Sequence, residues 1–194
     1  AKWCMSPYDA YALESAWQLS AAVGGTITVV TAGPDRCNRM LTDAAAVGAD
    51  NLVRIDVEDL SALDSTQVQS LLAAAVQNIG ADVVFCGKQA SDTNAGSTGP
   101  GVAELMEAAC VTLVSEVSAD GNGFSAMRPS SSGSERIAVS APCIFAFDKG
   151  TTEMRRPNVR GIMMAKKKQI KVISAADLGV DIGAASVSIS GHTP

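Results

Sequence analysis

Apolar and polar positions repeat with two different periods along the chain, which predicts helices alternating with strands. Residues 7–22 carry apolar side chains at helical spacing, with a proline in the first turn and two glycines after the last turn. The same reasoning predicts helices at 36–47 and 64–79, and strands at 26–32, 52–57 and 81–86. Strands joined through helices imply right-handed crossovers, so we expect an α/β fold with a Rossmann-like parallel sheet flanked by helices.

Beyond Cys110 the pattern changes to short strand-like pieces, which predicts a β-rich C-terminal region. These pieces lie at 111–118, 121–129, 135–140 and 142–148. Residues 120–123 read Asp-Gly-Asn-Gly, a strong hairpin-turn signal between the first two pieces. Residues 151–160 have no apolar period and contain three arginines, so we expect an exposed loop there. We therefore expect one α/β domain at 1–178 and a Gly-, Ala- and Ser-rich extension at 179–194.

The composition is that of a globular protein without a general affinity for nucleic acid. The chain has 194 residues, 47% of them apolar, and a net charge of −5, whereas nucleic-acid binding relies on Lys and Arg to neutralise phosphates. The apolar runs fall short of the roughly 18 residues of a membrane span, so we expect no membrane insertion. A soluble protein of the cytoplasm is the expectation, or of the mitochondrial matrix in a eukaryote.

Cysteine and histidine usage argues against metal and nucleophilic chemistry. The five cysteines are scattered without a Cys-x-x-Cys motif, and the single histidine is His192, near the end. We therefore expect buried free thiols in a reducing compartment, and neither a zinc site nor a disulfide framework. A Ser-His-Asp or Cys-His arrangement has almost no support, so we assign no catalytic and no metal-binding residue.

The stretch from Cys86 to Met106 is the strongest candidate for a binding site. It joins a continuously apolar strand to a turn rich in Gly, Ser and Thr, and then to a helical segment. Such a turn leaves backbone N–H groups free at a helix N-terminus, where they favour a phosphate. The alternative is a polar connection with an ordinary Ser/Thr cap, since neither a GxGxxG nor a GxxxxGK[ST] pattern is present.

Four segments closely resemble the beta subunit of electron-transfer flavoproteins. Residues 155–170, RRPNVRGIMMAKKKQI, resemble the signature region of that family, and residues 86–99 resemble its CGKQA nucleotide turn. Residues 4–16 and 31–50 are similar to its first and second helix segments. The resemblance covers about residues 3–178, in order and at the family spacing.

The resemblance implies an electron carrier rather than an enzyme. Members pair with an alpha subunit that carries the redox-active FAD, while the beta subunit holds AMP or, in the electron-bifurcating type, a second FAD. Their electron-transfer partners are acyl-CoA-type or related dehydrogenases, as in fatty acid oxidation. Carried over to this chain, the implied nucleotide contacts are Ser6, Pro7, Tyr8, Asp9, Ala32, Gly87, Lys88, Gln89, Asp92, Thr93, Asn94, Ala95, Gly96, Ser97 and Thr98.

Departures from the family pattern leave the choice between AMP and FAD open. The usual acidic run followed by Asn-Gln reads differently at 92–97, and Ser6 stands where an Asn is typical. Thr98 resembles the AMP-holding type, whereas Gly99-Pro100 resembles the bifurcating type. The lysine run at 166–168 favours AMP.

Family members begin with a strand and loop of the kind MKIxVxVKxVPDT, whereas this chain opens afterwards, at about AKWCM. In the family, that strand forms the centre of the sheet and the loop one wall of the nucleotide pocket. A parallel sheet without its central strand would expose apolar edges. We therefore expect the domain to be part of a longer protein that supplies this strand, the alternative being a genuinely short paralogue.

The basic segment near residue 160 has a functional and a neutral interpretation. In the family it is a recognition loop that anchors partner dehydrogenases through a leucine, and Val159 occupies that position here. The implied docking residues are Arg155, Arg156, Val159, Arg160, Lys166 and Lys167. An apolar tip flanked by cations suits a partner with an acidic rim. The neutral interpretation is a solvated charged surface.

Two other functions compete with the electron carrier. A nucleotide-binding regulatory domain of similar architecture would explain the Gly/Ser turn but gives no reason for the lysine-rich segment. An autonomous enzyme ranks third, because the chain lacks an internal histidine and paired carboxylates.

Overall fold

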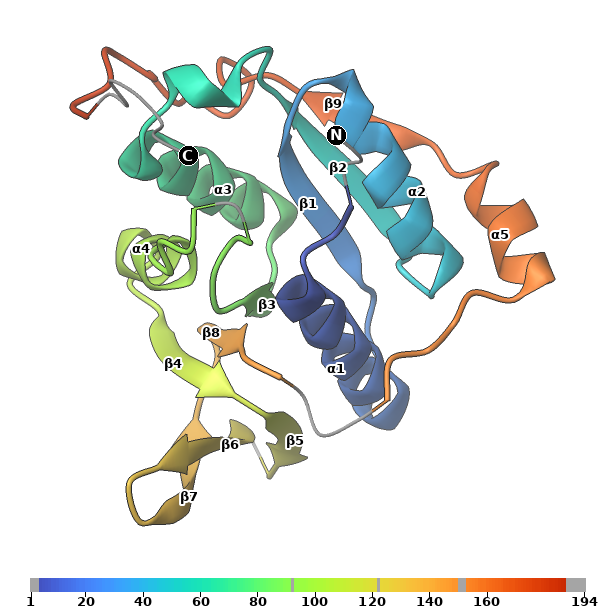
Figure 1. Ribbon diagram of the computed structural model, residues 1–194, viewed down its shortest axis with the longest axis vertical. Coiled ribbons are helices and arrows are strands. Elements are labelled where there is room, and N and C mark those ends of the chain that lie inside the picture. Colours follow the sequence, from blue (N-terminus) through green and yellow to red (C-terminus); the bar gives the residue numbers. More distant parts are fainter. Residues whose placement is uncertain (1–3, 92, 122, 150–152, 188–194) are drawn as a thin grey trace, which may run out of the picture.

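The computed structural model describes residues 4–91, 93–121, 123–149 and 153–187 (Figure 1). The helices are α1 Pro7–Val23, α2 Asn38–Ala46, α3 Ser65–Ile79, α4 Thr98–Leu105 and α5 Val159–Ala165, with short 3-10 turns at Asp35–Cys37 and Leu60–Ala62. The strands are β1 Thr28–Gly33, β2 Asn51–Asp56, β3 Val83–Gly87, β4 Ala109–Val114, β5 Glu116–Asp120, β6 Gly123–Ser130, β7 Gly133–Val139, β8 Cys143–Phe147 and β9 Ile170–Ile173. The expected α/β class is confirmed.

The strands form three sheets of three strands each. Two of the sheets are parallel, in the orders β1-β2-β9 and β3-β8-β4, and the third is an antiparallel meander, β5-β6-β7. The hairpin predicted at 120–123 is present, with Asp120 paired to Gly123. The piece predicted at 142–148 is not part of a C-terminal β region, because as β8 it is the central strand of the second parallel sheet. The piece at 111–118 divides at Ser115 between that sheet and the meander.

The two parallel sheets lie in one layer because the same two helices cover both of them. On one face, Ala12 of α1 belongs to the cluster on which Phe85 of β3 packs, and Leu13 of α1 packs against the cluster that contains Leu52 of β2. On the other face, Leu71 of α3 shares a cluster with Ile55 of β2, and Ala73 shares a cluster with Ile144 of β8. Figure 1 shows α1 and α3 on either side of β3. Within the described ranges, β1 pairs only with β2 and β3 only with β8, so each has one strand edge without a partner.

Local signals explain where the helices begin and end. Asp64 and Gln67 form a reciprocal capping box at the start of α3, and Gly80 in the left-handed conformation ends that helix. Ser6 caps α1 and Pro7 follows at the first helical position. Val159 and Arg160 lie in α5 rather than in the predicted exposed loop, because the Asn158 side chain accepts a hydrogen bond of 2.7 Å from the Gly161 N–H and so starts the helix.

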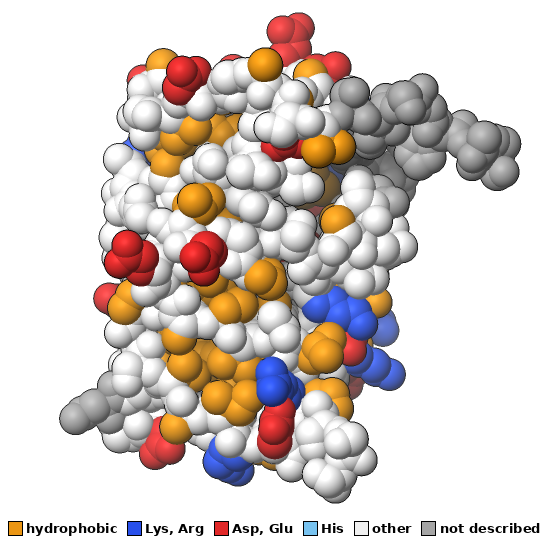
Figure 2. Space-filling view, turned by 90° about the vertical axis from the view of Figure 1, so that its left-hand side faces the viewer, with side chains coloured by type: hydrophobic (Ala, Val, Ile, Leu, Met, Phe, Trp, Pro, Cys, Tyr) orange, Lys and Arg blue, Asp and Glu red, His pale blue; other side chains and the backbone are white. Residues whose placement is uncertain are grey.

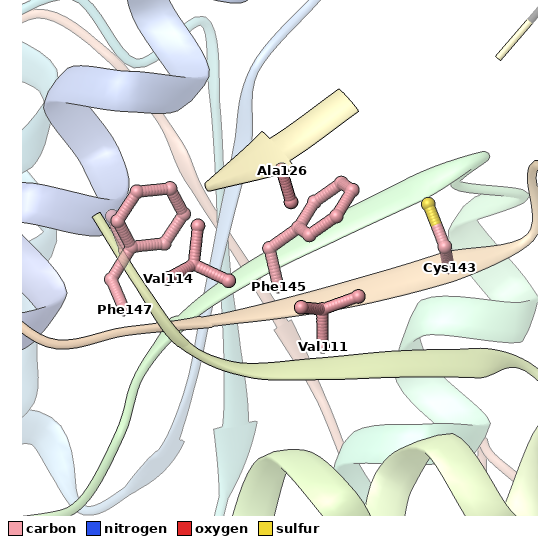
Figure 3. Packing of buried hydrophobic residues seen from close by; sticks show 7 residues of the cluster. Val111, Val114, Ala126, Cys143, Phe145 and Phe147 are labelled. Atoms are coloured by element: carbon pink, nitrogen blue, oxygen red, sulfur yellow. The ribbon is translucent and has the colours of Figure 1, made fainter. Parts of the chain in front are cut away.

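One buried cluster joins β8 to the meander. Phe145 and Phe147 are fully buried and pack against Val111 and Val114 of β4 and Ala126 of β6 (Figure 3). The central strand β8 is buried along its whole length, as expected for a strand covered on both faces. The face on which α4 and the edge strand β4 lie carries many apolar side chains, with acidic and basic side chains scattered among them (Figure 2).

The cysteines and the C-terminal segment complete the fold. All five cysteines are free; Cys37 and Cys143 are buried as expected, but Cys4 and Cys110 are exposed, in the segment before α1 and on the edge strand β4. Val180 and Ile182, in the predicted extension, pack against the cluster formed by β2 and α3. Among the described helices, none combines the length and the apolar character that crossing a membrane requires.

Candidate functional site

The first turn of α1 and the end of β3 meet directly, which brings two separate parts of the predicted nucleotide site together. The backbone N–H of Gly87 donates a hydrogen bond of 2.7 Å to Oδ1 of Asp9. A β-carbon at Gly87 would lie 2.8 Å from the Tyr8 Cβ and 3.0 Å from the Asp9 backbone nitrogen. Only glycine therefore allows the helix to approach the strand this closely.

Asp9 is a half-buried carboxylate at this junction. Burial raises its pKa above the ordinary value, and the hydrogen bond from the Gly87 N–H opposes that rise. The carboxylate position is thereby fixed between α1 and β3, at the carboxyl end of a parallel strand. Ligands of open α/β sheets bind beyond such strand ends.

Lys88 places a positive charge beside the same junction. Its Nζ lies 2.9 Å from Oδ1 of Asp148, directly after β8, and 4.9 Å from the centre of the Tyr8 ring. The hydrogen bond to Asp148 raises the pKa of Lys88, so the ammonium stays charged at neutral pH. The lysine joins the ends of β3 and β8 to the start of α1.

The turn that follows is held by its own side chains and by the start of α1. The Ser91 hydroxyl lies within hydrogen-bonding distance of the Ser6 hydroxyl, at 3.3 Å, and Gln89 donates to the Asn94 side chain at 2.9 Å. Asn94 and Gly96 both adopt positive φ angles, of 52° and 67°. The neighbouring residues Thr93 and Ala95 are exposed, whereas the predicted contact Asp92 lies outside the described residues.

The start of α4 differs from an ordinary capped helix. Ser97 stands at the N-cap position with helical φ and ψ, and its side chain makes no capping hydrogen bond. Its carbonyl instead accepts a hydrogen bond of 3.0 Å from Gln69 on α3. The Thr98 side chain is exposed at the first helical position. The Ser/Thr-cap alternative is therefore not what the structure adopts, and the hydroxyls remain available at the helix N-terminus.

Ala32 lies apart from this group, at the carboxyl end of β1 in the other parallel sheet. It packs against the cluster that contains Ile55 and Leu71. The neighbouring Gly33 carbonyl accepts a hydrogen bond of 2.8 Å from Arg54, whose side chain is only 4% exposed and also pairs with Asp35 at 2.6 Å. Arg54 was not predicted as a site residue, because a single arginine within an apolar strand gives no sequence signal of what it contacts.

Helix α5 presents an apolar groove to solvent. The groove has a volume of about 440 Å³ and is lined by Val159, Arg160, Met163, Met164 and Lys167. Val159, the predicted anchor, is 76% exposed and stands at the start of the helix. The two methionines were not predicted, although Met163 follows Val159 at the i, i+4 spacing that places both on one helix face. A second hollow, of about 420 Å³, lies where β1 and β2 begin, between Thr28 and Lys171, away from the predicted nucleotide residues.

Arg155 is held inside the chain, unlike the other predicted docking cations. Its Nε and Nη2 each donate a hydrogen bond of 2.8 Å to the buried carboxylate of Glu14, and its guanidinium lies 3.3 Å from the centre of the Trp17 ring. The hydrogen bonds from Arg155 lower the pKa of Glu14 to about 2. In the described part of the chain, Arg156, Arg160, Lys166 and Lys167 are exposed and form no ion pair, so they keep their charge available.

Comparison with known proteins gives a consistent set of relatives. Residues 1–178 match the family described as "Electron transfer flavoprotein domain". "Electron transfer flavoprotein subunit beta" of Bacillus subtilis is 34% identical over 182 residues, which cover 93% of this chain and 71% of that protein. The Mus musculus protein of the same name is 32% identical over 196 residues, covering 100% and 77%. "Protein FixA" of Azotobacter vinelandii is 29% identical over 184 residues, covering 91% and 66%.

Proposed function

Because the chain belongs to the electron transfer flavoprotein family, we propose that it is the beta-type subunit of a heterodimeric electron carrier. The alpha subunit would carry the redox-active FAD, and this chain would hold an adenine nucleotide and dock partner dehydrogenases. The observation that carries the proposal is the junction of α1 with β3, where Asp9 and Gly87 bring the two predicted nucleotide segments into contact. That junction lies at a strand end, where α/β proteins bind nucleotides.

The nucleotide phosphate would bind at the start of α4. Ser97 and Thr98 supply hydroxyls that the helix does not use for capping, and the first N–H groups of the helix add their partial positive charge. Lys88 lies one residue beyond β3 and contributes a cation to the same edge of the sheet. The exposed turn between Gln89 and Gly96 would then cover the ribose.

We propose AMP rather than a second FAD as the nucleotide. The sequence argument for a second FAD rested on the Gly99-Pro100 pair. A β-carbon at Gly99 would lie 2.9 Å from the Cys86 Sγ and 3.5 Å from the Ala146 Cβ, so packing of α4 on β3 and β8 requires a glycine there. The glycine is thus explained without reference to the ligand. The remaining sequence features, Thr98 and the lysine run at 166–168, are typical of the AMP-holding type and support AMP over a second FAD.

Partner dehydrogenases would dock on the groove of α5. Val159, Met163 and Met164 provide an apolar contact, which limits dissociation, and the unpaired cations around them attract an acidic rim, which speeds association. Arg155, which Glu14 and Trp17 hold against α1, would not reach the partner as a free cation. The electron itself would pass through the FAD of the alpha subunit.

Co-expression with an electron transfer flavoprotein alpha subunit tests the proposal. We expect a yellow one-to-one heterodimer, and we expect mass spectrometry after heat release to find one FAD and one AMP per heterodimer. Two FAD per heterodimer would reassign the nucleotide but keep the electron carrier. A colourless chain that ignores the alpha subunit and releases no nucleotide would overturn the proposed function.

A further inference from the structure

Met163 and Met164 are exposed although their side chains are large and apolar. Their exposed fractions are 61% and 54%, whereas Ala165, the next residue, is buried. The inner side of α5 contacts α2 closely, because a β-carbon at Gly161 would lie 2.6 Å from the Ala46 carbonyl oxygen. The helix therefore turns its small residues inward and both thioethers outward.

The two methionines form one surface with the predicted anchor. Together with Val159 they line the groove of about 440 Å³, and Arg160 and Lys167 complete its wall. Methionine is flexible and polarisable, so it suits a contact that must adapt to a partner. Its sulfur is also the atom of such a surface that peroxides oxidise.

We propose that Met163 and Met164 are a reversible oxidation site that switches docking off, an inference that rests on the proposed docking role of the groove. The reaction is a two-electron oxidation by hydrogen peroxide. The thioether sulfur attacks one peroxide oxygen, the O–O bond breaks, and a sulfoxide and a water molecule form after transfer of the proton. The FAD proposed for the alpha subunit would, when reduced, generate hydrogen peroxide from dioxygen, because dioxygen chemistry is a property of that cofactor. Methionine sulfoxide reductases restore the thioether.

Oxidation should change the lifetime of the complex rather than the rate at which it forms. A sulfoxide is polar, and burying it against an apolar surface without a hydrogen-bond donor is unfavourable. The charges of Arg156, Arg160, Lys166 and Lys167 do not change in the reaction. Electrostatic steering therefore persists, whereas the apolar contact that slows dissociation is lost.

The other methionines provide an internal reference. Met154 is 39% exposed, and Met5, Met40, Met106 and Met127 are only partly exposed. Because access to the sulfur governs oxidation, we expect Met163 and Met164 to react first, Met154 next and the remaining four last.

The experiment uses the assembled heterodimer, treated with increasing hydrogen peroxide and quenched with catalase. Peptide mass spectrometry gives the order of oxidation. Dissociation and association rates are then measured on an immobilised acyl-CoA or related dehydrogenase that reduces the heterodimer. We expect dissociation to become at least tenfold faster once both sulfoxides have formed, with the association rate within twofold of the untreated protein. Treatment with methionine sulfoxide reductases A and B should restore the original rate.

Matched variants separate this site from general damage. Met163→Leu combined with Met164→Leu keeps the surface apolar but removes both sulfurs, so the dissociation rate of this variant should be the same before and after peroxide treatment. Met154→Leu should remain as sensitive as wild type. Unchanged dissociation of the doubly oxidised wild type would overturn the inference, as would equal peroxide sensitivity of the double variant.

A failure of the proposed docking role can be told apart from a failure of the oxidation site alone. If Val159→Ala leaves docking of the untreated heterodimer unchanged, or if none of the dehydrogenases reduces it, the groove is not the docking surface. The oxidation site then loses its function whatever the order in which the methionines react, so that result counts against both.

Discussion

Asp9 and Gly87, 78 positions apart in the chain, are joined by a hydrogen bond of 2.7 Å from the glycine N–H to the carboxylate. This bond holds the first turn of α1 against the end of β3, and the two segments carry most of the predicted nucleotide contacts. The site therefore depends on how close a helix and a strand can approach, which is set by the missing side chain at position 87.

Replacing that glycine should separate the two segments. In Gly87→Ala the added methyl group would meet the Tyr8 Cβ and the Asp9 nitrogen, so α1 must move. We expect a loss of about 1–3 kcal/mol in the free energy of unfolding, together with loss of bound nucleotide. Gly24→Ala is the control, because it strains the other end of α1, where nothing lies within 4 Å of the added carbon. Urea unfolding and nucleotide analysis should show both variants destabilised but only Gly87→Ala depleted of nucleotide.

An added negative charge at the start of α4 should repel the phosphate. We expect Ser97→Glu to lower the nucleotide content of the purified heterodimer at least tenfold, while its helix content stays unchanged. Ser118→Glu on the exposed surface of β5 adds the same charge away from the site and should retain the nucleotide. Full nucleotide retention in Ser97→Glu would place the phosphate elsewhere.

The ion pair between Glu14 and Arg155 should make stability depend on acidic pH. The folded-state pKa of Glu14 is lowered from 4.5 to about 2, so the carboxylate stabilises the fold fully above pH 4.5 and progressively less as the pH falls towards 2. The shift corresponds to about 3 kcal/mol. We expect Glu14→Gln to be less stable by about that amount at pH 7, and the difference to shrink at pH 3. Glu116→Gln, at an exposed position, should show no such trend in urea titrations at the two pH values.

The docking groove should respond differently to loss of an apolar side chain and to reversal of a charge. Val159→Ala removes two methyl groups, worth about 1–2 kcal/mol if the partner buries them, so electron transfer from the dehydrogenase should weaken several-fold. Arg156→Glu should mainly slow association and flatten its dependence on salt. Flavin reduction by the dehydrogenase, measured against ionic strength, distinguishes the two effects. If both variants match wild type at every ionic strength, the segment is a solvated surface.

The unpaired edges of β1 and β3 should accept one further parallel strand. Their side chains are only partly buried, in contrast to β2 and β8, and α1 and α3 already cover both faces of the layer at this point. We expect a longer form of the protein, extended upstream by a strand-forming segment, to protect the amides of β1 and β3 from hydrogen exchange. Amides of the meander provide the reference. Unchanged exchange in β1 and β3 would contradict this expectation.

Local signals in the sequence predicted most of the helices and strands. The capping box of α3, the proline of α1 and the apolar runs of β2 and β3 act within a few residues, so they can be identified without the fold. The central position of β8 could not be predicted in this way. This position depends on pairing with β3, which precedes β8 by more than 50 residues, and with β4, which precedes it by about 30. An isolated run of apolar residues does not show which strands it will pair with.

The candidate site was predictable where it is continuous and unpredictable where it is assembled from distant parts. The turn after β3 has a recognisable composition, and its resemblance to a family also indicated the first turn of α1. Arg155 is held by Glu14, which lies 141 positions away in the chain. The arginine-rich sequence around Arg155 does not indicate that one of its arginines packs against a helix. The exposure of Met163 and Met164 likewise follows from Gly161 packing on Ala46, a contact between helices rather than a local pattern.

The contacts that hold Arg155 against α1 also bear on the entropy change of the proposed partner binding. Arg155 is fixed by two hydrogen bonds and an aromatic face, and α5 begins only four residues later. The groove is thus preorganised, and a partner need not restrict a disordered segment when it binds. Binding should therefore proceed with little loss of conformational entropy and as a rigid-body encounter. Docking affinity should fall when the contact between Glu14 and Arg155 is broken by a substitution of Glu14, a buried residue of α1.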